Sequence, residues 1–206
     1  IESAKGKEDF EKEILSIKDL QERGLKYFLE AKKLFYLKNF DSSLALFKQA
    51  FNSFKEYGEK ATQVYLKSVN EAFELFFKED IFTVAHELAE LLVSLAEEFG
   101  SMFYLGVGQQ FLGELKIKKG KLEEGIDYLD QATVVFAKLP DYAGAGYANY
   151  LIGETYFKNS EWDHSALYYV EAISNFNQIK GHSDFYQQRK DVWATLSNIK
   201  KMISNI

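Results

Sequence analysis

The chain has 206 residues, of which 47% are hydrophobic and 16% aromatic, with a single proline and no cysteine. This composition argues against long disordered linkers, and it excludes disulfide bonds and thiolate metal sites. The net charge of −6, from 25 basic and 31 acidic side chains, disfavours nucleic acid as a partner because phosphate backbones attract basic surfaces.

Helical periodicity runs through nearly the whole sequence, and no stretch alternates strictly enough to predict a strand. The pattern predicts an all-α fold. In chain order the expected helices are a leader near residues 8–15, the pairs 17–38 with 41–57, 60–78 with 80–98, 102–119 with 121–137 and 142–159 with 161–178, and a last helix at 184–204.

Helix-breaking residues recur at a nearly constant interval. Gly58, Gly100, Pro140 and Gly181 lie 42, 40 and 41 residues apart, each between two helical segments. A fixed period of about 20 to 50 residues is typical of stacked repeat arrays. We therefore expect a leader helix over 1–16 and one repeat domain over 17–206. Its repeats are expected at 17–58, 59–100, 101–140 and 141–181, with a capping helix at 182–206.

The leader segment is amphipathic, because Phe10, Ile14 and Ile17 recur at helical spacing. It is expected either to fold back as an N-terminal cap or to engage another protomer. Acidic residues in the same segment offset its lysines, which disfavours a role at a membrane surface.

Residues that accept hydrogen bonds from free backbone N–H groups precede several of the expected helices. Ser160-Glu-Trp-Asp163 resembles a capping box with Asp in place of the usual Glu or Gln. Asp80 and Asp141 are expected to serve as caps or first-turn carboxylates at two other helix starts.

The residue types also align between units. Leu112, Gly113, Gly120, Leu122, Gly125 and Ala132 resemble the tetratricopeptide repeat (TPR) signature, and Ile152, Gly153, Tyr156, Trp162, Ser165, Tyr169 and Ala172 match it again. The resemblance covers roughly residues 17–205. The period of about 41 residues is similar to that of the lengthened TPR variety in kinesin light chains and in peptide-sensing bacterial regulators of the Rap type. The resemblance implies a right-handed superhelical array of antiparallel helix pairs.

The same resemblance implies a binding groove lined by the first helix of each pair. The partner-binding positions that it implies are Phe28, Lys32, Phe35, Val69, Phe73, Phe76, Gln110, Glu114, Tyr147, Tyr150, Glu154 and Phe157. The set is mostly apolar and aromatic, with two carboxylates in its C-terminal half. Such a groove suits an amphipathic helix, or a hydrophobic peptide that carries a basic residue.

An alternative interpretation makes this apolar face internal core. Several neighbouring positions that the family pattern would bury are polar, among them Glu30, Glu71, Gln109 and Lys116. Either the helices are rotated relative to the family pattern, or the first-helix face packs inside the protein. The sequence leaves both alternatives open.

Nothing in the sequence indicates catalysis, a cofactor or a metal. The three histidines, His86, His164 and His182, are too widely spaced for a local metal motif. The glycine pairs at 106 and 108 and at 144 and 146 do not follow strands, and neither continues into a nucleotide-binding loop. We therefore expect no catalytic residue, no metal site, no cofactor and no enzyme activity.

The expected function is a non-catalytic scaffold or adaptor that binds a peptide or helix of a partner protein. One alternative is a peptide-responsive regulatory module, and another is a structural protein that self-assembles as a homo-oligomer. We expect a cytoplasmic location and no membrane insertion, because no apolar run is long enough to span a bilayer.

Overall fold

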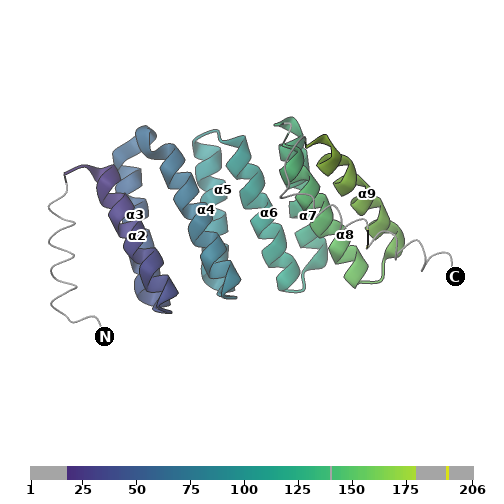
Figure 1. Ribbon diagram of the computed structural model, residues 1–206, viewed down its shortest axis with the longest axis horizontal. Coiled ribbons are helices and arrows are strands. Elements are labelled where there is room, and N and C mark those ends of the chain that lie inside the picture. Colours follow the sequence, from purple (N-terminus) through teal and green to yellow (C-terminus); the bar gives the residue numbers. More distant parts are fainter. Residues whose placement is uncertain (1–17, 140, 180–193, 195–206) are drawn as a thin grey trace. The chain divides into compact units, whose positions relative to one another are not determined.

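The computed structural model describes residues 18–139, 141–179 and 194, and every regular element in these residues is helical. The elements are α2 (Leu20–Tyr36), α3 (Phe40–Tyr57), a 3₁₀ helix (Gly58–Ala61), α4 (Thr62–Lys78), α5 (Phe82–Glu98), α6 (Met102–Lys118), α7 (Leu122–Lys138), α8 (Tyr142–Lys158) and α9 (Trp162–Gln178). The predicted all-α class is confirmed, and α2 with α3, α6 with α7 and α8 with α9 pack as predicted pairs (Figure 1). The predicted leader at 1–16 and capping helix at 182–206 lie outside the described residues.

The chain forms two compact units, and the boundary between them falls inside α5. Unit 1 ends at Leu88 and contains α2, α3, α4 and the start of α5. Unit 2 begins at Ala89 and contains the rest of α5 with α6 to α9. The expectation of one continuous domain over 17–206 stays a prediction.

The turn inside each helix pair contains one residue in the left-handed region. These residues are Lys38, Asp80, Gly120 and Ser160, with φ between 57° and 77°. They are 42, 40 and 40 residues apart, so the turn repeats with the same period as the helices. A left-handed residue after a helix turns the chain so that the following backbone N–H groups donate hydrogen bonds to the free carbonyls of the last helical turn.

The predicted capping roles of Ser160 and Asp80 are therefore wrong. Each residue ends the preceding helix rather than starting the next one: the amide of Glu161 bonds to the Tyr156 carbonyl at 3.0 Å, as expected for the αL helix ending. The predicted cap at Asp141 is confirmed, because its carboxylate accepts from the Gly144 amide at 3.1 Å.

Small residues bring the two helices of a pair into close contact. A Cβ atom added at Gly113 would lie 2.9 Å from the carbonyl oxygen of Gly125, and the reverse substitution would give the same distance. In another pair the buried Ser165 hydroxyl donates to the Gly153 carbonyl at 2.9 Å. Small residues therefore permit the close crossing of the helices in these two pairs.

The core of unit 1 is a continuous cluster of aromatic rings. Phe28 packs edge-on against Phe47 at 5.2 Å between ring centroids, and Phe35 packs in the same way against Phe76 at 5.2 Å. Phe47 and Phe76 join the two contacts at 6.1 Å. Each such pair contributes about 0.5 to 1.5 kcal/mol beyond the burial of its area, so these rings hold α2, α3 and α4 together.

Candidate binding surface on the first helices

In unit 1 the apolar side chains that the family pattern assigns to a groove are buried. Phe28, Phe35, Val69, Phe73 and Phe76 are each no more than 6% exposed. They form the aromatic core described above, so none of them offers an accessible contact in this structure.

The remaining predicted position of unit 1, Lys32, is partly exposed and already paired. Its ammonium lies 3.1 Å from the Glu71 carboxylate and over the Phe28 ring at 5.7 Å from the centroid. The ion pair joins α2 to α4. This explains one of the polar residues that seemed out of place in the family pattern: Glu71 serves as the partner of Lys32.

In unit 2 the predicted positions come together on a surface that remains partly accessible. It consists of the partly exposed Glu114 on α6 and Tyr147, Tyr150 and Glu154 on α8, together with the buried Gln110 on α6, and we call it the first-helix surface. Helices α6 and α8 contact each other directly although α7 lies between them in sequence. The spacings i, i+4 on α6 and i, i+3, i+7 on α8 place each set on one side of its helix.

Glu114 is a carboxylate held in a partly desolvated position. It is only partly exposed, and burial raises its pKa above the ordinary value for glutamate. The Gln110 amide, which donates to it at 3.0 Å, and the nearby Lys118 oppose that rise. An ionised carboxylate in such a position gains more than an exposed one from a cation placed beside it.

Two tyrosines fill the space beside Glu114. The rings of Tyr147 and Tyr150 stack with centroids 6.1 Å apart, and Tyr150 meets Tyr169 of α9 at 6.0 Å. Burial raises the pKa of Tyr147 to about 12, with further contributions from the Glu114 carboxylate and Tyr150. The Tyr147 phenol therefore stays neutral and can donate a hydrogen bond over the physiological range.

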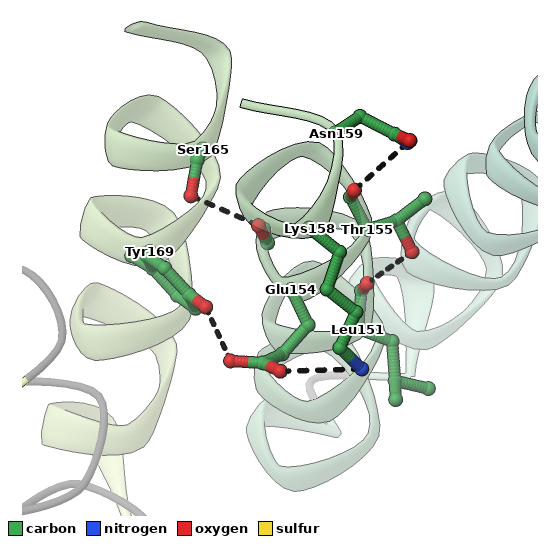
Figure 2. Close-up of polar contacts among 8 residues, drawn as sticks. Leu151, Glu154, Thr155, Lys158, Asn159, Ser165 and Tyr169 are labelled. Carbon is green, nitrogen blue, oxygen red and sulfur yellow. Dashed lines mark hydrogen bonds and ion pairs between the residues drawn. The ribbon is translucent and has the colours of Figure 1, made fainter. Parts of the chain in front are cut away.

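The second carboxylate, Glu154, is fixed by neighbours on two helices. Figure 2 shows the Tyr169 hydroxyl donating to one oxygen of Glu154 while the Lys158 ammonium lies 3.5 Å from the other. Burial, followed by this hydrogen bond, raises the pKa of Tyr169. Because Tyr169 is fully buried, it holds the Glu154 carboxylate in one orientation.

Phe157 ends the predicted set and lies near the turn between α8 and α9. Its ring packs edge-on against Trp162 at 5.2 Å, and both rings lie against the buried cluster of Tyr169 and Phe176. Phe157 is only partly exposed, so its main role in this structure is to pack α8 on α9.

The sequence prediction missed Tyr169 as a contributor to this surface. Tyr169 matches the TPR signature but lies on the second helix of its pair, whereas the predicted binding positions all lie on first helices. One signal in the sequence could have indicated this contact: Glu154 and Tyr169 lie on the two helices of one close-packed pair.

The described residues contain no cluster of His, Asp or Glu that could hold a metal ion. Among the same residues, no helix is both long and apolar enough to cross a membrane.

The first-helix surface presents aromatic rings, phenol donors and two carboxylates. This set is suited to contact with a polypeptide that carries a cationic side chain.

Neither a family model nor a curated protein sequence matches this chain. Solved structures match its fold. The crystal structure of BtubC (BKLC) from P. vanneervenii has a TM-score of 0.73 and 15% identity, over 90% of this chain and 74% of that one. The apo form of RapI has a TM-score of 0.67 and 12% identity, over 97% of this chain and 78% of that one. At these identities the likeness shows the fold alone, a helical-repeat arrangement.

Proposed function

We propose that this protein is a non-catalytic adaptor of the cytoplasm that binds a peptide segment of a partner protein through the first-helix surface of unit 2. The observation that supports the proposal is the pair of partly exposed carboxylates, Glu114 on α6 and Glu154 on α8, together with the stacked rings of Tyr147 and Tyr150. The partner segment would carry a basic side chain for the carboxylates and an apolar face for the tyrosines.

The physical argument rests on desolvation. Glu114 loses solvation when the protein folds, which is why its pKa is raised. A guanidinium or ammonium group from a bound peptide would compensate that loss, whereas an acidic or neutral peptide would add to it. Tyrosine rings add contact area at little cost in side-chain entropy. The surface therefore selects for basic segments and against acidic ones.

The test uses peptides selected on the protein from a displayed library of short helices. We expect the selected sequences to be enriched in Lys or Arg flanked by apolar residues. The binding constant of the best sequence is then measured by fluorescence anisotropy for the parent protein and for the double variant Glu114→Gln, Glu154→Gln. Both substitutions keep an acceptor oxygen for Gln110 and Tyr169 while removing the charge, and we expect binding to weaken about tenfold or more.

The matched control removes two charges elsewhere in unit 2. Glu97 and Glu98 are exposed residues at the end of α5, outside the first-helix surface. The double variant Glu97→Gln, Glu98→Gln should bind the same peptide as tightly as the parent protein. Equal losses in both variants, or none in the Glu114 and Glu154 variant, would show that the peptide binds somewhere else.

A further inference from the structure

A second accessible site lies in unit 2, away from the first-helix surface. It is an open pocket of about 560 Å³ formed by the start of α7, the end of α8 and the turn into α9. Tyr156 lines it, two residues after Glu154. Two helical residues are separated by about 200° of rotation, so Tyr156 and Glu154 project from nearly opposite sides of α8.

Among the residues that the structure describes, the only aromatic one that lines this pocket is Tyr156, and two further rings pack against it. The Tyr156 ring stacks on Tyr168 of α9, with centroids 5.7 Å apart and an angle of 24° between the ring planes. The His164 ring also packs against Tyr156, with centroids 5.0 Å apart and an angle of 31° between the ring planes. The Tyr168 hydroxyl donates to Asp130 of α7 at 3.3 Å, which fixes this ring in place.

Three other lining residues carry negative charge. Glu123 and Asp127 line it from α7 and Glu161 lines it from the turn, and all three are exposed. Burial raises the pKa of Tyr156, and the surrounding carboxylates raise it further, with Glu161 the largest contributor among them.

Three basic residues on the elements around this pocket have carboxylate partners of their own. Lys116 of α6 and Lys121 of the turn before α7 both pair with Glu124 of α7, which is not a lining residue. His164 pairs with Glu161 at 3.3 Å, and its side chain is largely exposed. The lining carboxylates Glu123 and Asp127 therefore remain available to an incoming cation.

We propose that this pocket binds a basic side chain, arginine or lysine, of a partner protein. Cations are attracted both by the faces of aromatic rings and by carboxylates, and here the two lie around one hollow. A hollow this open suits the end of a side chain whose backbone is held on the surrounding surface. The site is separate from the first-helix surface, so the proposal does not depend on that surface binding a peptide.

The probes are the tripeptides acetyl-Gly-Arg-Gly-amide and acetyl-Gly-Lys-Gly-amide, with acetyl-Gly-Gln-Gly-amide as the neutral reference. The protein is labelled with 3-fluorotyrosine, and the fluorine signal of Tyr156 is assigned from the variant Tyr156→Phe. We expect a saturable shift of this signal with the arginine and lysine peptides and none with the glutamine peptide.

Two sets of variants separate the pocket from general attraction to an acidic protein. Asp127→Asn with Glu161→Gln should weaken binding about tenfold, whereas Glu97→Gln with Glu98→Gln removes the same charge elsewhere and should leave it unchanged. Because the first pair also removes the partner of His164, helical circular dichroism must match the parent protein. Tyr156→Leu leaves the charge intact but removes the ring, and is followed through the Tyr168 signal. It should also weaken binding several-fold.

Several results would overturn the proposal. They are the absence of a saturable shift, equal losses in the pocket and control variants, or full retention of binding in Tyr156→Leu. A titration with spermidine tests for a polyamine site. Saturation by spermidine without any response to the arginine and lysine peptides would show a polyamine site instead of a site for a protein side chain.

Discussion

The tight crossing of α6 and α7 makes Gly113→Ala the most informative single substitution in the fold. The new methyl group would lie 2.8 Å from Cγ of Leu129 and 2.9 Å from the Gly125 carbonyl oxygen. Ordinary contacts between carbon atoms are about 3.5 to 4.0 Å. One of the two crowded atoms belongs to the backbone of the opposing helix, so rotation of a side chain cannot remove the overlap.

The expected size of the effect follows from two opposing contributions. Overpacking of this kind costs about 1 to 3 kcal/mol, and replacing glycine by alanine inside a helix gains about 0.5 to 1 kcal/mol. We expect a net loss of up to about 2.5 kcal/mol in the free energy of unfolding. For a chain of this length that corresponds to a midpoint lower by up to about 10 °C.

The assay is thermal and urea unfolding followed by circular dichroism, with Ser174→Ala on the exposed side of α9 as the control, expected within about 0.5 kcal/mol of the parent. Gly125→Ala crowds the Gly113 carbonyl across the same contact. Once α6 and α7 have separated for one methyl group, the second should cost less, so the double variant should lose less than the sum. Stabilisation by Gly113→Ala would refute the close approach of the two helices.

Three further outcomes are expected. Ser165→Ala should cost about 1 kcal/mol in urea unfolding, because it removes the buried hydrogen bond to Gly153; no loss would contradict a structural role for this hydroxyl. Glu114→Gln should raise stability at pH 7, because the native pKa is raised and ionisation of Glu114 therefore opposes folding. This gain should shrink towards pH 4.5, where the carboxyl is increasingly protonated in both states; a destabilised variant at pH 7 would reverse the assigned sign. The pKa values of Tyr147 and Tyr168 are raised from 10.0 to about 12, so native phenols keep protons that unfolded ones release, and stability should fall as the pH rises from about 10 to about 12. In ultraviolet titration, replacing either tyrosine by Phe should remove a phenol that ionises late; loss of one that ionises near pH 10 would contradict this assignment.

The carboxylates show how far sequence reasoning reached into the candidate surface. The family pattern predicted that Glu114 and Glu154 belong to it, and the structure places both on partly exposed helix sides. The pattern could not predict that Tyr169 holds Glu154 in place, because that bond depends on how α9 is rotated against α8. It also placed Phe28 and Phe73 in the same set, although their side chains are buried.

The sequence by itself determined the helices, their pairing and their period. These features follow from local information: apolar spacing, small residues at crossings and breakers between segments. Even the turn residue Ser160, wrongly expected to start a helix, lies within two residues of the predicted boundary.

Only the tertiary structure decided which side of each first helix is core and which is accessible. Helical periodicity marks an apolar side, but burial depends on the rotation of each helix against its neighbours, and that rotation is set by packing between residues far apart in sequence. Hence the first helices of unit 1 bury the predicted aromatic residues, while those of unit 2 keep Glu114, Tyr147 and Tyr150 partly exposed.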